Sequence, residues 1–362
     1  MIIPAILYEY IYLIIVGIFT IVLTLQYVSY SNERLLKANT SSVSIVCIVL
    51  TIFMIIFIGT RPLSGVFIDM MNYKLHYDIL SEYDFEFDPE ARNLLFGNIE
   101  RYIAMNDYDI EIFFIIMAFI YFGGIYWSIR RIFPNDTLFA FVVYLAAFST
   151  FSYATNGIKA GAAASIFLVA LCYYDKKIIS AIFCLLSLGF HHSMILPIVA
   201  YAISIFYNKP KYLIWFWVIC LGISFLHITF FQELFAEIGD DKAEQYLALE
   251  NLEDWGGKQG FRLDFVAYSS VVVGIGWWVY DKIQLPYRSL YSVLYSTYLI
   301  TNGVWMLCMY ANFTNRIAYL SWALIPILII YPFLKFKITE NQYQKAVVVS
   351  ILHYCFTLFL EL

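Results

Sequence analysis

The chain of 362 residues is 62% hydrophobic and 14% charged, with a formal net charge of −5 and a mean hydropathy of +0.74. Ordinary soluble domains contain roughly 45–50% apolar and ~25% charged residues, so this composition excludes a soluble protein and indicates an integral membrane protein. The sequence has no long basic tract, and nucleic acid is therefore not an expected partner. A membrane bundle of this length is predicted to form a single transmembrane domain, residues 1–362.

A helix that spans a bilayer needs about 20 apolar residues. Twelve stretches meet or approach this length, and the predicted spans are roughly 5–27, 42–60, 110–129, 137–154, 158–174, 177–190, 193–207, 212–231, 264–281, 289–309, 317–334 and 343–361. The first stretch lacks the charged region and cleavage site of a signal peptide, so we expect a spanning helix there. The stretch at 177–190 is short and is expected to be a half-helix or a tilted helix. The predicted fold class is all-α, a polytopic bundle of about 12 transmembrane helices.

Lysine and arginine gather in alternate connections, and short connections rich in these residues face the cytoplasm. The cytoplasmic set comprises Arg34 and Lys37, Arg130 and Arg131, Lys176 and Lys177, Lys209 and Lys211, Lys282 and Arg288, and Lys335, Lys337 and Lys345. Both termini are then predicted to face outward.

Two long segments, 61–109 and 232–263, lie on the outward side in this topology. The first carries ten acidic and four basic residues, with apolar residues at helical spacing from 93 to 103. It is predicted to form short amphipathic helices at the outer membrane face. The second ends in WGGKQGFRLDF, whose glycines permit a turn that delivers Arg262 to the next span.

The stretch GTRPLSGVFIDMMNY, residues 59–73, places opposite charges at the end of a predicted span. Gly59 and Pro62 end the helix, and Arg61 and Asp69 follow close to the hydrocarbon boundary, where an unpaired charge is costly. The pattern indicates a polar site. The alternative is that Arg61 snorkels to the headgroups while Asp69 caps the next helix.

Four basic residues stand at the outer ends of predicted spans, beside glycine or asparagine: Arg61, Lys159, Arg262 and Arg316. Arginine offers forked donors that match phosphate oxygens, and lysine adds a compact charge, so four converging bases would bind a di-anion. Four separate side chains snorkelling to the headgroups are the alternative. Asp264 follows Arg262 closely enough that the two could simply pair.

His191 and His192 close the short predicted span at 177–190. Adjacent residues point to different faces of a helix, whereas a metal pair needs a spacing of three or four, so a metal site is not expected. One of the histidines could bond a phosphate or carry a proton, and the alternative is an interfacial histidine satisfied by backbone carbonyls. Asp69 is the favoured base or orienting acid. No signature of a nucleotide or metal site is present, and no cofactor is expected.

Five stretches in this order resemble the EpsG family of Wzy-like exopolysaccharide and O-antigen polymerases, in its Bacteroidetes branch. They are GTRPLSGVFIDMMNY, TNGIKAGAAASIF, GFHHSM, GFRLDFVAYS and FTNRIAYLSWALIP, and they extend over residues ~59 to ~325. The resemblance implies a GT-C-like glycosyltransferase at the outer face of the inner membrane, with both termini periplasmic. It would join oligosaccharide repeat units carried on undecaprenyl pyrophosphate for exopolysaccharide, capsule or O-antigen, without metal or nucleotide. Its partners would be this lipid-linked glycan as donor and acceptor, membrane lipid, and other polysaccharide-assembly proteins.

The resemblance also implies roles for the residues that stand out. The leaving pyrophosphate would be held by Arg61, Lys159, Arg262 and Arg316. The acceptor hydroxyl would be oriented or deprotonated by Asp69, His191 or His192, with Asn156 and Tyr73 contacting the sugar. Many family members carry an Arg-Gln pair after the asparagine of the motif that reads Asn156-Gly157-Ile158-Lys159 here, and the single Lys159 leaves its need in catalysis open.

Two other functions fit part of the pattern. An O-antigen-ligase-type transferase would use the same donor with a different acceptor. A flippase or transporter of the lipid-linked unit would carry charged groups along a path through the membrane midplane. The outer position of the four bases favours chemistry at one face.

Overall fold

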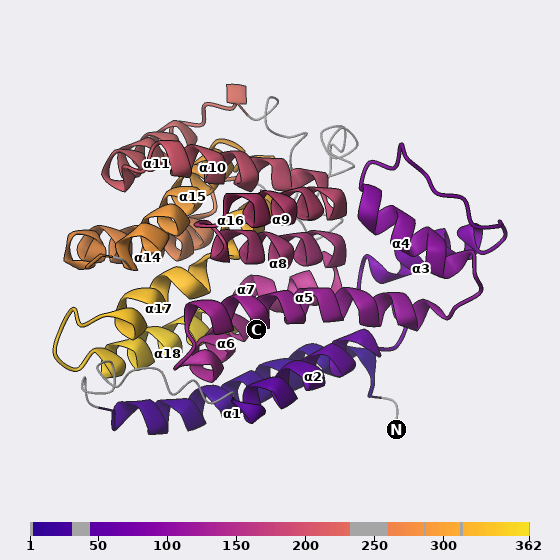
Figure 1. Cartoon of the computed structure of the whole chain (residues 1–362), viewed down its shortest axis with the longest axis horizontal. Coiled ribbons are helices and arrows are strands. Elements are labelled where there is room, and N and C mark those ends of the chain that lie inside the picture. Colours follow the sequence, from indigo (N-terminus) through magenta and orange to yellow (C-terminus); the bar gives the residue numbers. More distant parts are fainter. Residues whose placement is uncertain (1–2, 31–43, 232–259, 286, 312–313, 362) are drawn as a thin grey trace. The chain divides into compact units, whose positions relative to one another are not determined.

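The computed structural model describes residues 3–30, 44–231, 260–285, 287–311 and 314–361. Every regular element in these ranges is helical, which confirms the predicted all-α class (Figure 1). The chain divides into two compact units, one formed by Met1–His192 with Phe333–Leu362 and the other by Ser193–Pro332. They are called unit 1 and unit 2, and the single transmembrane domain stays a prediction.

The helices of unit 1 are α1 (Tyr8–Val28), α2 (Ile45–Gly59), α3 (Met70–Leu80), α4 (Leu94–Ala104), α5 (Ile110–Ile132), α6 (Thr137–Leu145), α7 (Phe148–Thr155), α8 (Ile158–Cys172), α9 (Lys177–Phe190) and α18 (Gln342–Glu361). Those of unit 2 are α10 (Ile195–Phe206), α11 (Pro210–Phe225), α14 (Leu263–Val279), α15 (Tyr287–Leu307) and α16 (Thr314–Trp322). Helix α17 (Ile325–Lys335) crosses from unit 2 into unit 1, and short 3-10 turns cover Ala5–Leu7, His192–Met194 and Tyr280–Lys282.

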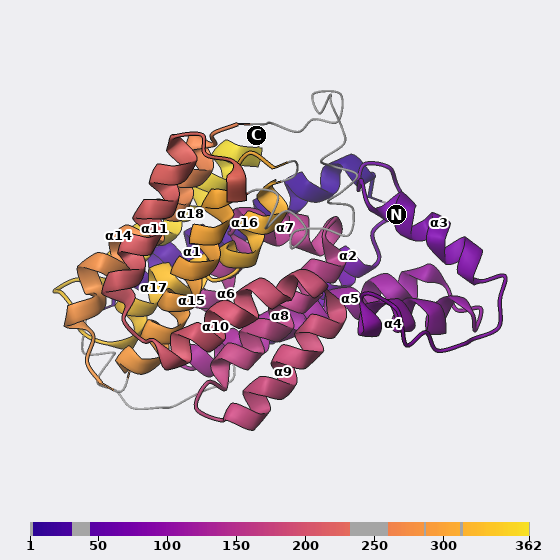
Figure 2. The ribbon, with the colours of Figure 1, turned by 90° about the horizontal axis from the view of Figure 1, so that it is seen from above.

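Small residues let the central helices of unit 1 approach closely. Helix α8 packs between α5 and α9, as Figure 2 shows. A Cβ atom on Gly124 of α5 would lie 2.9 Å from the side chain of Ser165, so no larger residue fits there without a shift. The Ser165 hydroxyl of α8 donates to the carbonyl of Ile120 on α5 at 3.1 Å, and the Ser187 hydroxyl of α9 donates to that of Ala163 on α8 at 2.7 Å. The small-residue run that follows Lys159 is therefore a packing surface for helices.

Helix α15 is the core of unit 2, and every residue from Tyr291 to Leu307 is buried. Its Asn302 amide is fully engaged, since Nδ2 donates to Ser269 Oγ at 3.1 Å and to Ser321 Oγ at 2.9 Å. The Asn302 carbonyl accepts from Trp217 Nε1 at 2.6 Å. A buried amide with all these bonds made fixes the register of α11, α14 and α16 around α15.

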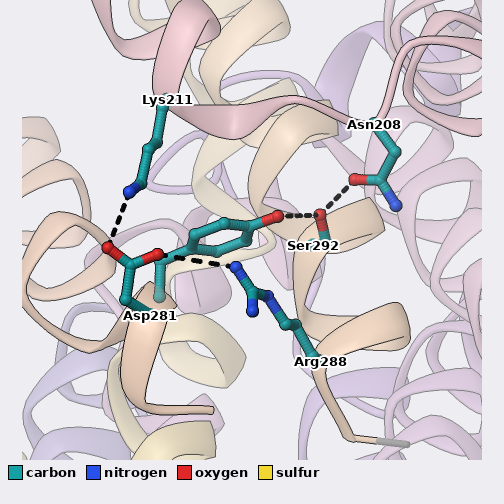
Figure 3. A network of polar contacts seen from close by, with 6 residues as sticks. Asn208, Lys211, Asp281, Arg288 and Ser292 are labelled. Atoms are coloured by element: carbon teal, nitrogen blue, oxygen red, sulfur yellow. Dashed lines mark hydrogen bonds and ion pairs between the residues drawn. The ribbon is translucent and has the colours of Figure 1, made fainter. Parts of the chain in front are cut away.

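Connections predicted to lie on the cytoplasmic side gather together within each unit. In unit 2, Asp281 contacts Lys211 at 2.6 Å and Arg288 at 3.5 Å, while Ser292 bonds Asn208 (Figure 3). In unit 1, Arg131 donates to the carbonyl of Cys172 at 2.9 Å, which joins the connections after α5 and α8. The grouping agrees with the predicted alternation of the helices, and the side of the membrane that each end faces stays a prediction.

Five helical stretches are long and apolar enough to cross a membrane, and a sixth is obtained if one bent pair counts as a single span. The five are Ala5–Val28, Ile110–Ile132, Leu263–Lys282, Thr314–Lys335 and Gln342–Glu361. The bent pair corrects the straight span predicted for 137–154, because α6 and α7 meet at 73° around residues 146–147. The structure therefore supports a membrane protein, and the count of about 12 spans and the GT-C-like architecture stay predictions.

Candidate functional site

The first outward segment contains two short helices, α3 and α4, which lie side by side (Figures 1 and 2). Helix α4 buries Phe96 and Ile103 while exposing Leu94 and Tyr102, so it is amphipathic as predicted. It packs against α3, α5 and α9. Most of the second outward segment, 232–259, lies outside the described residues. At its end Gly260 has φ +103°, the positive value that the predicted glycine turn requires.

Arg61 follows the end of α2 and is only 2% exposed, which excludes the alternative in which it snorkels to the headgroups. Its Nη1 donates to the carbonyl of Ile58 at 2.8 Å, and its Nη2 donates to that of Thr155 at 2.9 Å. The guanidinium carbon lies 4.8 Å from the centre of the Phe114 ring and 5.4 Å from that of Phe67. Burial lowers the pKa of Arg61 to about 10, so the side chain remains charged at neutral pH.

These bonds make Arg61 a clamp between the ends of two helices. The last carbonyls of a helix have no partner within it, and Arg61 satisfies one at the end of α2 and one at the end of α7. Thr155 is followed directly by Asn156, Gly157, Ile158 and Lys159, the predicted site motif. Arg61 therefore fixes the α7–α8 corner, residues 155–159, while its role as a direct pyrophosphate ligand stays a prediction.

Lys159 lies in the first turn of α8, where it is half-buried, and Asn156 is half-buried in the same corner. The corner is tight, since a Cβ atom on Gly161 would lie 2.6 Å from the carbonyl oxygen of Tyr153. A lysine is electrostatically unfavourable at a helix N-terminus, where the dipole already carries partial positive charge, unless an anion binds there. Lys159 and the buried Arg61, which bonds the carbonyl of Thr155, together concentrate positive charge at the α7–α8 corner.

Helix α3 aligns Asp69, Tyr73 and His76 on one face, because residues at spacings of four and three stack along a helix. Asp69 is half-buried just before α3 and makes no side-chain capping bond to it, so the structure removes the capping alternative. Tyr73 packs against Phe96 of α4, with ring centres 5.9 Å apart, and its hydroxyl is near enough to Arg61 to raise the pKa of that group. The face of α3 that carries Asp69 and Tyr73 is therefore the one directed toward Phe96 of α4 and Arg61.

The structure adds a pair that the sequence analysis missed, His76 and Glu100. His76 Nδ1 lies 3.2 Å from Glu100 Oε1, and the side chains are 58% and 5% exposed. Glu100 raises the pKa of His76, while the positive charges of Arg101 and Lys159 act to lower it. Lys159 is thus close enough to His76 for its positive charge to affect the pKa of the imidazole. The available signals were the alignment of His76 with Asp69 and Tyr73, and the position of Glu100 on the apolar face of α4.

The expectation that His191 and His192 point to different faces of a helix is wrong. Helix α9 ends at Phe190, His191 has extended backbone angles, and the two imidazole rings stack with centres 4.9 Å apart. His191 is 4% exposed. The predicted end of the span at residue 190 is confirmed, and both histidines lie in the connection after it, His192 at the start of a 3-10 turn.

His192 joins the end of α9 to the start of α4. Its Nε2 lies 2.9 Å from Arg92 Nη2, and its backbone N–H donates to Asn93 Oδ1 at 3.0 Å. Arginine can only donate, so Nε2 accepts and the ring proton is carried on Nδ1, which faces Asn93 Oδ1 at 3.4 Å. These bonds give His192 a role in holding the outward segment against α9.

The other two predicted bases belong to unit 2. Arg262 forms a forked ion pair with Asp264, at 3.0 Å and 2.6 Å, as the pairing alternative predicted, and its guanidinium carbon lies 3.6 Å from the centre of the Phe265 ring. Arg316 is half-buried in the first turn of α16. Within unit 1 Arg61 bonds the carbonyl of Thr155, four residues before Lys159, and the convergence of the four bases stays a prediction.

Within the ranges that the structure describes, no group of three or more His, Cys, Asp or Glu residues is arranged to hold a metal ion. The independence of the activity from metal stays a prediction.

Comparison with known proteins gives one family. The model of the EpsG family matches residues 44–362, a range that contains Arg61, the α7–α8 corner, the two histidines and both unit 2 arginines. Comparisons with curated proteins and with solved structures found no match. With its helices long enough to span a membrane and a family match over most of its length, the chain belongs to the EpsG family.

Proposed function

We propose that the chain is a membrane polysaccharide polymerase, a glycosyltransferase that joins oligosaccharide repeat units carried on undecaprenyl pyrophosphate. The observation that carries the proposal is the α7–α8 corner, where Lys159 opens α8 and buried Arg61 fixes the preceding turn, in a chain of the EpsG family. The reaction would take place at the outer face of the inner membrane, in exopolysaccharide, capsule or O-antigen synthesis. Both termini would then be periplasmic.

The chemistry requires charge stabilisation at the leaving group. A hydroxyl of the acceptor sugar attacks the anomeric carbon of the donor glycan, and the bond from that carbon to the pyrophosphate oxygen breaks. The electron pair leaves on the lipid pyrophosphate, so fixed positive charge at that position lowers the barrier, by about 10²–10³ in rate for one donor.

Lys159 is the residue of unit 1 best placed to contact that anion. It is half-buried at the helix N-terminus, where backbone dipoles add to its charge. Arg61 would act through its position and through a charge that burial protects from screening. Arg262 and Arg316 remain the proposed ligands from unit 2, and Arg262 would exchange Asp264 for a phosphate oxygen on binding.

The acceptor would meet Asp69 and Tyr73 on α3 and Asn156 in the corner, with His191 and His192 on the far side of the outward segment. Asp69 is the acid proposed to orient the acceptor hydroxyl, because it lies on the same face of α3 as Tyr73. Membrane lipid and other polysaccharide-assembly proteins are the proposed partners besides the lipid-linked glycan, with no nucleic acid and no cofactor.

The test is a reconstitution of the purified chain in nanodiscs with its native repeat unit on undecaprenyl pyrophosphate. Wild type is expected to produce a glycan ladder, and Lys159→Ala is expected to slow ladder formation by about 10²-fold. Lys74→Ala is the matched control, because Lys74 is a partly exposed base of α3 whose ion pair, among the described residues, is with Asp78 of the same helix. A wild type without a ladder contradicts the polymerase proposal, and transfer to another acceptor or translocation in liposomes would then identify a ligase or a flippase.

A further inference from the structure

We propose that His76, oriented by Glu100, is the general base that takes the proton of the acceptor hydroxyl. This inference rests on the proposed function, since it assigns a residue to one step of glycosyl transfer.

The pair has the burial pattern of an oriented base. The Glu100 side chain is 5% exposed, and its buried Oε1 accepts no hydrogen bond among the described residues, while His76 Nδ1 lies within ion-pair distance of it at 3.2 Å. Burying a carboxylate is costly unless a partner repays the lost hydration. That partner is an imidazole whose side chain is 58% exposed. In many active sites a base acts on the nucleophile while a further group orients the base. A buried acid beside an exposed imidazole has this arrangement, with the acid as the orienting group.

The geometry also selects the nitrogen that reacts. Nδ1 faces Glu100 at 3.2 Å, so the neutral ring carries its proton there and presents the Nε2 lone pair on the opposite edge. An imidazole with this tautomer can accept a proton at Nε2 while the carboxylate stabilises the resulting imidazolium.

The other histidines of unit 1 are less suited to this role. His192 Nε2 faces Arg92 Nη2 at 2.9 Å, so its lone pair is engaged, and His191 and His353 are only 4% and 6% exposed. His76 shares its face of α3 with Asp69 and Tyr73, and the charge of Lys159 on α8 acts to lower the pKa of His76. The base is therefore within electrostatic range of the residue proposed to hold the leaving group. The charged groups around it are Glu100 and Arg101 on α4 and Lys159 on α8, while Lys74 and Asp78 on α3 pair with each other.

The step is balanced in atoms and electrons. The hydroxyl oxygen forms the new bond to the anomeric carbon as its proton passes to His76 Nε2. The bond between that carbon and the pyrophosphate oxygen breaks, and its electron pair leaves on the lipid pyrophosphate. His76 then releases the proton to water, which restores the neutral ring.

The test compares wild type, His76→Asn, Glu100→Gln and Lys74→Ala in the nanodisc assay over a range of pH. His76→Asn is expected to lower kcat by about 10²–10⁴ with little change in KM, and to remove the fall in rate at acid pH. Glu100→Gln is expected to keep part of the activity and to move that acid limb to lower pH, because the carboxylate that raises the pKa of His76 is gone. Lys74→Ala should match wild type.

A readout without substrate accompanies the assay. Since Glu100 raises the pKa of His76, the pair stabilises the fold below the ordinary histidine pKa of about 6.5, and this contribution is lost as pH rises through the raised value. His76→Asn should therefore be less stable than wild type at about pH 5.5 and nearly equal at about pH 8. A wild-type ladder with unchanged kcat and acid limb in His76→Asn overturns the inference alone. A wild type that makes no ladder overturns both proposals, because His76 then has no acceptor to activate.

Discussion

Replacing Arg61 tests whether this side chain acts as a structural clamp or as a direct phosphate ligand. Arg61→Ala removes two hydrogen bonds from a charged donor, to the carbonyls of Ile58 and Thr155 at 2.8 Å and 2.9 Å. Each such bond contributes about 1.5–3 kcal/mol, so the variant should lose about 3–6 kcal/mol of unfolding free energy. Arg61→Lys keeps the charge but reaches one carbonyl, and should lose about 1.5–3 kcal/mol.

The assay is denaturant unfolding in detergent micelles, followed by circular dichroism and compared with polymerisation by the same preparations. Lys159→Ala is the comparison variant, and it should lose less unfolding free energy than Arg61→Ala while activity falls, because Lys159 is half-buried whereas Arg61 is 2% exposed. If Arg61→Ala unfolds with the free energy of wild type and yet makes no polymer, the clamp is refuted. Arg61 would then act on the substrate directly.

Three other changes test separate parts of the structure. Asn302→Leu removes the oxygen that accepts from Trp217 Nε1 in the core of unit 2, and should cost about 1–3 kcal/mol of unfolding free energy. A stability equal to wild type would show that the amide network is dispensable. Gly124→Val should separate α5 from α8, because even a Cβ atom would lie 2.9 Å from Ser165, and an unchanged melting temperature in detergent would refute this packing. His192→Leu should release the start of α4 from α9 by removing the contact with Arg92, which hydrogen exchange would detect as faster exchange over 88–96, and unchanged protection would contradict the link.

The sequence was sufficient to predict a structural feature where the physical cause of that feature was local. The charge of Arg61 beside Gly59 and Pro62 correctly indicated a polar position at the end of a helix, and the apolar spacing around Phe96 correctly indicated α4. The close placement of Asp264 correctly indicated an ion pair with Arg262.

The sequence was insufficient to predict a feature that depends on contacts between residues far apart in the chain. The acceptor of Arg61 is the carbonyl of Thr155, 94 residues away, so no local pattern could show that the guanidinium is a clamp. The bend between α6 and α7 falls at Ala146-Ala147, where neither glycine nor proline marks a break. The pairing of His76 with Glu100 depends on how α3 packs against α4, which the spacing within either helix does not determine.

The central claim is that the chain transfers a glycan from lipid pyrophosphate to another repeat unit. The most direct measurement is the amount of undecaprenyl pyrophosphate that wild type releases in nanodiscs for each glycosidic bond formed. We expect equal amounts of released lipid and of new bonds, which rise together with ladder length and are lost together in Lys159→Ala. Release of the lipid without bond formation, or neither product from the native repeat unit, would contradict it.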